Sequence, residues 1–158
     1  MNINKFTQKS MEAVQNCEKL AYEFGNQEID QEHLLKSLID QEDGLILKLI
    51  EKMEINTAHF SNRVTEDLNK KVKVQGGDLR ISNDLNKVLI TAEDEAKAMG
   101  DEYVSVEHLF LSLLKYPNKA MKELFKEYGI TRDRFLTALS TVRGNQRVTS
   151  DNPEATYD

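Results

Sequence analysis

Two Glu-His pairs, Glu32-His33 and Glu107-His108, stand seventy-five residues apart and are the first candidates for chemistry. A carboxylate beside an imidazole is common in acid–base catalysis and in metal sites. Adjacent residues of a helix point about 100° apart, however, and neither pair belongs to a His-Glu-x-x-His motif. We therefore expect each glutamate to complement a helix dipole and each histidine to pack between repeats, with no metal site.

Residues for other kinds of catalysis are missing from the sequence as well. Cys17 lies on an apolar helical stripe, which is typical of a small core residue. There is no Gly-x-Ser-x-Gly motif, and Gly76-Gly77 lies in a polar stretch without the Lys-Ser/Thr of a nucleotide-binding loop. The sequence predicts a binding module, not an enzyme, with no catalytic residue and no cofactor of its own.

The Glu-His pairs belong to a longer internal repeat. The segment Ile29–Leu38 returns as Val104–Leu113, and the same offset pairs residues 6–64 with residues 81–139. Such self-similarity is the mark of a duplicated structural unit. The repeated identities include Glu18/Glu93, Ala21/Ala96, Gly25/Gly100, Leu34/Leu109, Ser37/Ser112, Leu49/Leu124, Ile55/Ile130 and Phe60/Phe135.

Both units read as four helices, because apolar residues recur at helical spacing and glycine and proline are few. Thr7 and Ser82 offer N-caps to the first helix of each unit, and Gly25 and Gly100 end it. We expect an all-α fold in which two four-helix repeats, related by a pseudo-twofold axis, pack as one compact domain.

The expected domain covers residues 1–142, with repeat one at about 6–68 and repeat two at about 81–142. Residues 69–80 are polar, lack the helical period and read as a linker between repeats. Residues 143–158 have no apolar stripe and read as a flexible linker toward a further domain.

Composition narrows the classes of partner. Of 158 residues, 39% are apolar, which is enough for a core, and the net charge of -6 comes from interleaved acids and bases. No basic stripe and no long apolar run are present, so neither nucleic acid nor a membrane is the expected partner. A single cysteine suits a reducing compartment, and the cytoplasm is the expected location.

The seam between two helical repeats is the expected binding surface. Thr7 begins the first helix, and Asp101 and Glu107 lie near loop and helix starts of repeat two. Two carboxylates there would favour a cationic segment of a polypeptide. The alternative is that both are solvated helix caps.

These residues also carry a family resemblance. Phe6-Thr7, Gly25 followed by Glu32-His33-Leu34, and the stretch 100–109 (Gly-Asp-Glu-Tyr-Val-Ser-Val-Glu-His-Leu) resemble the Clp amino-terminal repeat domain of AAA+ unfoldases. Residues 143–157 are similar to the stretch that joins this domain to the first ATPase domain in ClpB-type disaggregases.

The resemblance implies a domain tethered to a hexameric, ATP-driven threading ring, to which it delivers unfolded or aggregated polypeptide. It implies substrate contacts at Thr7, Asp101 and Glu107. ATP and Mg would belong to the parent protein, which would form the hexamer and meet a DnaK-type chaperone system through a middle domain outside this chain. The isolated domain would be a monomer.

A second interpretation stays open. In the related ClpC domain, two glutamates preceded by Gly-Thr serve phosphoarginine recognition, and Glu32 and Glu107 stand at those places here. The residues before them differ, being Asp30-Gln31 and Ser105-Val106. Phosphoarginine reading, or docking of a folded adaptor in a Clp protease, is the alternative function.

Overall fold

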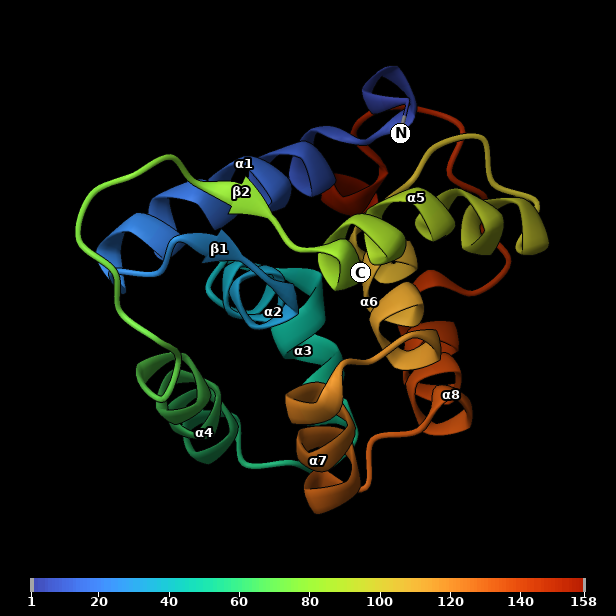
Figure 1. The fold of residues 1–158 in the computed structure, drawn as a ribbon. Helices are drawn as coiled ribbons and strands as arrows, with labels where there is room; N and C mark the ends of the chain where they lie inside the picture. Colours follow the sequence, from blue (N-terminus) through green and yellow to red (C-terminus); the bar gives the residue numbers. More distant parts are fainter. Residues whose placement is uncertain (1, 158) are drawn as a thin grey trace.

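A computed structural model describes residues 2–157 of the chain, except the side chains of residues 155 and 156. Eight α-helices in the described part form two repeats of four, so the all-α expectation is confirmed (Figure 1). Short strands and 3-10 turns complete the fold. The elements in chain order are η1 (Ile3–Lys5), α1 (Gln8–Glu23), β1 (Glu28–Ile29), α2 (Gln31–Ile39), α3 (Leu45–Lys52), α4 (Thr57–Asn69), β2 (Arg80–Ile81), α5 (Asn83–Ala98), α6 (Val106–Lys115), α7 (Lys119–Tyr128), α8 (Arg132–Arg143) and η2 (Pro153–Thr156).

Local sequence signals explain where the helices begin. The Thr7 hydroxyl accepts a hydrogen bond from the Ser10 amide at 3.2 Å, and the Ser82 hydroxyl accepts one from the Leu85 amide at 2.9 Å. Each bond satisfies one of the free amides at a helix start. The duplicated sequence therefore produces duplicated caps for α1 and α5.

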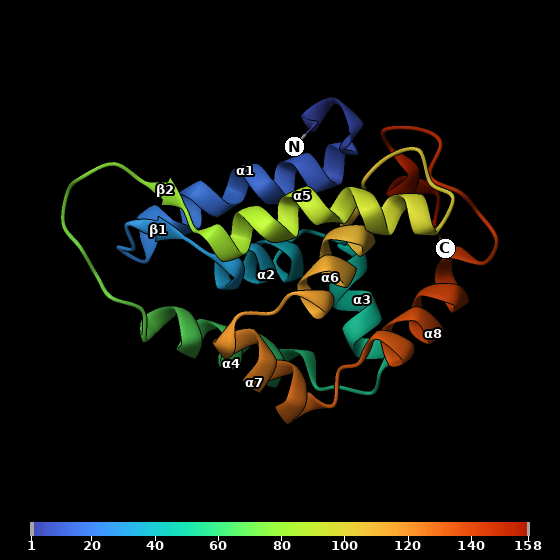
Figure 2. The same cartoon turned by 45° about the vertical axis from the view of Figure 1, so that its right-hand side comes forward.

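The two repeats share one hydrophobic core. Phe60, Phe110 and Phe135 are completely buried, and the rings of Phe110 and Phe135 lie 4.5 Å apart between centroids. Both views place α1 and α5 on one side of the molecule and α4 and α7 on the opposite side, with α2, α3 and α6 between them (Figures 1 and 2). Neither repeat has a core of its own.

Two short backbone pairings join the repeats in a crossed manner. Ile29 pairs in parallel with Ile81, and Phe6 pairs in parallel with Val104. Under the offset of seventy-five residues, Ile29 corresponds to Val104 and Phe6 to Ile81. The start of each repeat thus lies beside the loop before the Glu-His helix of the other repeat.

The segment after α8 lies against the second repeat and the start of α1 (Figure 1). Val148 is completely buried, and its carbonyl accepts hydrogen bonds from the amides of Glu102 and Tyr103 at 2.8 and 3.3 Å. The domain boundary at residue 142, with a flexible linker beyond it, stays a prediction. In this structure residues 144–157, which we call the tail, are packed on the domain.

Candidate functional site at the seam between the repeats

The crossed pairings bring helix N-termini together in two places. In one place the starts of α2 and α5 meet, with Asp30 and Ser82 as their N-caps. In the other, the starts of α6 and α1 meet, with Ser105 and Thr7 as theirs. We call these the α2–α5 junction and the α1–α6 junction. Helix N-termini carry free amides and partial positive charge, so both junctions favour carboxylates.

A buried histidine organises each junction, as the sequence predicted. His33 Nδ1 accepts from the Asp30 amide, and His108 Nδ1 accepts from the Ser105 amide, both at 2.9 Å. Both rings are completely buried. The histidine takes the place that a glutamate or glutamine holds in a common capping box, so it fixes the helix start.

The second nitrogen of each ring meets a different partner. His33 Nε2 bonds the amide oxygen of Asn26 at 2.9 Å, whereas His108 Nε2 bonds a carboxylate oxygen of Asp101 at 2.6 Å. Burial and the nearby charge of Lys71 lower the pKa of His33 to about 4. His33 is therefore neutral at physiological pH.

The carboxylates of the α1–α6 junction are buried and paired with the cation that ends α8. Asp101 is 8% exposed and Glu107 is completely buried. Arg143 Nη1 donates to Glu107 at 3.2 Å, and Arg143 Nη2 donates to Asp101. Burial raises the pKa of Asp101, but hydrogen bonds from His108 and Arg143 outweigh it and place the pKa below its ordinary value.

The tail completes this junction with a carboxylate and a phenol. Thr7 donates its hydroxyl proton to Glu154 Oε2 at 2.8 Å, and the Val106 amide donates to the same oxygen at 3.3 Å. The Tyr157 hydroxyl donates to Glu107 at 3.1 Å. The structure places Thr7, Asp101 and Glu107 at this one junction, and their role as substrate contacts stays a prediction.

The α2–α5 junction has the same arrangement with its own charges. Asp30 Oδ1 accepts from the Ser82 hydroxyl and from the Gln31 amide, both at 2.8 Å. The Lys71 amine lies 3.0 Å from Asp30 and 2.9 Å from Glu32. Residues 69–80 are therefore more than a connection, because Lys71 forms ion pairs with both carboxylates of the first junction.

Sequence analysis missed Lys71, Arg143, Glu154 and Tyr157. All four lie in or next to segments that lack an apolar period and were interpreted as linkers. One signal was available: two acids expected at a packed seam require a cation nearby, since buried carboxylates are rarely unpaired. Arg143 stands at the end of the helix that closes repeat two and could have been proposed on that ground.

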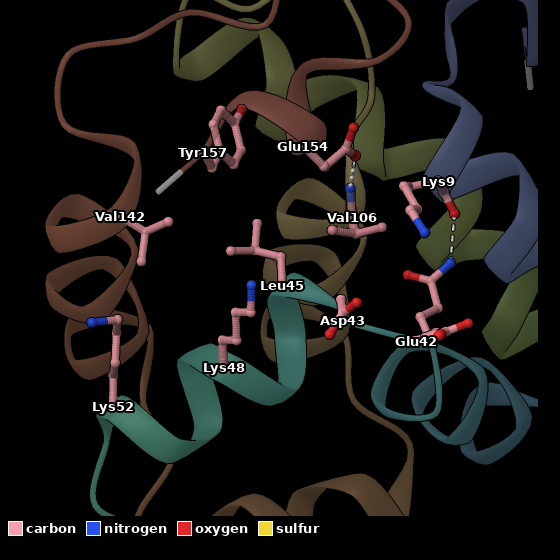
Figure 3. A pocket seen from close by; sticks show the side chains of 12 residues that line it. Lys9, Glu42, Asp43, Leu45, Lys48, Lys52, Val106, Val142, Glu154 and Tyr157 are labelled. Carbon is pink, nitrogen blue, oxygen red and sulfur yellow. Dashed lines mark hydrogen bonds between the residues drawn. The ribbon is translucent and has the colours of Figure 1, made fainter.

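A cavity of about 470 Å³ adjoins the α1–α6 junction. Leu45, Val106 and Val142 give it apolar walls, and the tail contributes Glu154 and Tyr157 (Figure 3). The remaining lining is charged or polar on the α1, α2–α3 and α3 sides, namely Lys9, Gln41, Glu42, Asp43, Gly44, Lys48 and Lys52. Apolar walls with a charged rim suit a segment of polypeptide.

Other kinds of site find little support in residues 2–157. No group of three or more His, Cys, Asp or Glu side chains is placed to hold a metal ion within that range. Burial raises the pKa of the Cys17 thiol to about 12, so this core residue is a poor nucleophile. Over the same range, no helix is both long and apolar enough to cross a membrane.

Comparisons with known proteins agree with this architecture. The model of the Clp repeat (R) N-terminal domain matches residues 5–128. Chaperone protein ClpB of Nitratidesulfovibrio vulgaris is 42% identical over 164 residues, and that of Bacillus anthracis is 39% identical over 163 residues. Both alignments cover 100% of this chain and 19% of the relative, so the chain spans about a fifth of their length.

Solved structures share the fold. The Hsp104 N-terminal domain from Candida albicans superposes with a TM-score of 0.82 at 26% identity, covering 95% of this chain and 99% of that one. A ClpV N-domain in complex with a VipB peptide superposes with a TM-score of 0.69 at 19% identity, covering 96% and 91%.

Proposed function

Because the chain belongs to the Clp repeat N-terminal domain family, we propose that it is the substrate-engaging amino-terminal domain of an ATP-dependent disaggregase of the ClpB type. It binds unfolded or aggregated polypeptide and helps deliver it to a hexameric threading ring. ATP and Mg act in the rest of that longer protein, whose partner is a DnaK-type chaperone system. The site is the α1–α6 junction with the adjoining cavity.

One observation supports this proposal: the seam already holds a stretch of polypeptide without regular secondary structure by its main chain. The Val148 carbonyl accepts from the amides of Glu102 and Tyr103, and the Asp151 carbonyl accepts from the Gln8 amide at 2.7 Å. Main-chain hydrogen bonds do not depend on side-chain identity, so they suit a domain that binds many unfolded sequences.

Thr7, Asp101 and Glu107 have separate parts in this proposal. Thr7 presents a hydroxyl donor to the ligand. Asp101 and Glu107 hold Arg143, and together these three form the charged base of the site. Arg143 offsets one of the two carboxylate charges, so the preference for cationic segments expected from the sequence is weakened but not removed.

An NMR titration with a reduced, carboxymethylated protein that stays unfolded in buffer tests the proposal. We expect amide shifts to gather at Thr7, Gln8, Val106 and the loop before α6, and to be absent when the same protein is added in its folded form. The Thr7→Val variant should lose affinity, whereas its counterpart Ser82→Ala at the other junction should not. Shifts confined to other surfaces would refute the site.

Adaptor docking is the second candidate, because the ClpV N-domain of the same fold was solved with a VipB peptide. Phosphoarginine reading belongs to this alternative and would use Glu32 and Glu107. Each of these carboxylates is ion-paired here, to Lys71 and Arg143 respectively, so a ligand guanidinium would have to displace a resident cation. An NMR titration with free phosphoarginine distinguishes phosphoarginine recognition from our proposal. Under our proposal the amides of both junctions do not shift.

A further inference from the structure

We propose that the α1–α6 junction is a carboxylate-binding site that the chain's own Glu154 fills, and that acidic segments of a polypeptide ligand bind there in competition with the tail. The proposal rests on the proposed function, because it names the chemistry and the regulation of the same seam. It assigns the ligand an acidic side chain, glutamate or aspartate, within an extended segment.

The donors of the site are fixed by the fold. Thr7 is completely buried, and its hydroxyl and the Val106 amide point at one carboxylate oxygen, at 2.8 and 3.3 Å. Neither donor comes from the tail. Without Glu154, the Thr7 hydroxyl and the Val106 amide would lose their shared acceptor, and such a pair of donors at helix starts stabilises an anion.

The internal repeat provides an independent observation. Ser82 and Gln31 correspond to Thr7 and Val106 under the offset of seventy-five residues, and they also donate to a single carboxylate oxygen, that of Asp30. Position 105 carries serine where position 30 carries aspartate. The same pair of donors therefore binds a carboxylate in both halves. In the first half this carboxylate belongs to the helix cap itself, and in the second half it comes from the tail.

The tail carboxylate is less well satisfied than Asp30. Glu154 Oε1 is buried and has no hydrogen-bond partner among the residues whose side chains the structure describes, and Glu107 lies close by. Burial raises the pKa of Glu154, and the charge of Glu107 raises it further against the Thr7 bond, whereas the pKa of Asp30 is lowered because hydrogen bonds and Lys71 outweigh its burial. A buried carboxylate with one unsatisfied oxygen is a replaceable ligand.

Once Glu154 is set aside, the charges that line the cavity favour an acidic competitor by a small margin. The lining then has three lysines and two acids, namely Lys9, Lys48, Lys52, Glu42 and Asp43 (Figure 3). A segment entering along this cavity would meet their charge before reaching Thr7. The docked tail occupies the site in part of the molecules. The apparent affinity for any ligand is therefore the affinity of the open site multiplied by the fraction of molecules whose site is open.

A fluorescein-labelled synthetic peptide of residues 147–157 is the probe, measured by anisotropy against the 158-residue chain and its Glu154→Ala variant. We expect the variant to bind the peptide about tenfold more tightly, because its own tail has lost the Glu154 carboxylate and competes less well. A peptide with glutamine at the position of Glu154 should bind the variant at least about tenfold more weakly than the parent peptide. Glu18→Ala removes the same charge from an exposed place on α1 and should leave the affinity at the wild-type level.

Equal affinity of the peptide for the wild-type, Glu154→Ala and Glu18→Ala chains would overturn the proposal, as would equal binding of the two peptides. If circular dichroism shows that Glu154→Ala is unfolded, the wild-type chain with excess peptide decides: a shift of the Val106 amide that the glutamine peptide does not cause supports the site, and its absence refutes it. Glutamate-dependent peptide binding without binding of unfolded protein would refute the proposed function alone.

Discussion

The two junctions have the same donors and the same buried histidine, yet they obtain their charges from different parts of the chain. The α2–α5 junction takes its carboxylate from its own helix cap, Asp30, and its cation from Lys71, directly after α4. The α1–α6 junction takes its cation from the last residue of α8, Arg143, and its anion from Glu154 in the tail. The first junction takes its cation from the linker between the repeats, and the second takes a carboxylate from the tail that follows α8.

The group opposite the histidine separates the junctions further. Asn26 is neutral, so the side chain opposite His33 requires no cation to balance it. Asp101 is charged and buried, so it needs both His108 and Arg143 as donors. The duplicated position thus carries asparagine in the first repeat and aspartate in the second, and the aspartate is paired with an arginine.

Loss of Arg143 should give the largest difference between the junctions. Arg143→Met leaves the buried Asp101 and Glu107 without their cation, and we expect a loss of about 3–5 kcal/mol in the free energy of unfolding. Lys71→Met at the other junction should cost less, about 2 kcal/mol, because the Lys71 side chain is 20% exposed against 2% for Arg143, so water can in part replace it. Urea denaturation of both variants measures the contrast, and equal losses would contradict it.

Acid should destabilise the α2–α5 junction through His33. Its pKa is about 4 in the folded chain and about 6.5 when unfolded, so the unfolded state binds more protons between these values. The contribution of neutral His33 to the free energy of unfolding is therefore fully present above pH 6.5. It decreases as the pH falls toward 4, and the total loss below pH 4 is about 3 kcal/mol. His33→Gln keeps a capping side chain that does not titrate and should flatten this part of the pH profile. An unchanged slope in the variant would show that His33 is not its source.

Exchange of the group opposite the histidine should move this pH window. Asn26→Asp puts a carboxylate against His33 Nε2, as Asp101 is against His108, and should raise the pKa of His33 by about one unit or more. NMR titration of the His33 ring measures the shift. Asn26→Ala, which removes the partner without adding charge, is the matched control and should not raise the pKa.

The sequence was sufficient for the local features and for the repeat. The caps Thr7 and Ser82 and the two histidines are readable because a helix start involves residues three positions apart. The pairing of Phe6 with Val104 cannot be predicted from the spacing of neighbouring residues. It is an isolated backbone bridge between residues that are far apart in the sequence and belong to different repeats.

The charges of the site were harder to predict for a different reason. Glu154 acts through one carboxylate and Val148 through its backbone, in a stretch whose other side chains are largely polar, so no periodic pattern marks the segment as part of the domain. Arg143 ends a helix in a way that fits a solvated cation as well as a buried one. Burial of Asp101 and Glu107, which only the fold determines, decides between these interpretations.

The smallest expected effect is an energetic coupling between Thr7 and Glu154, and it tests directly whether the tail acts at the α1–α6 junction alone. Thr7→Val and Ser82→Ala each remove one helix cap, and each should cost about 1 kcal/mol in unfolding free energy. Only Thr7 also donates to the tail, so a double-mutant cycle of Thr7→Val with Glu154→Gln should give a coupling of about 0.5–1.5 kcal/mol. The cycle of Ser82→Ala with Glu154→Gln should give none within about 0.3 kcal/mol, because Ser82 bonds Asp30 and not the tail. Equal coupling in the two cycles would mean that Glu154 acts on the whole domain and not on the α1–α6 junction.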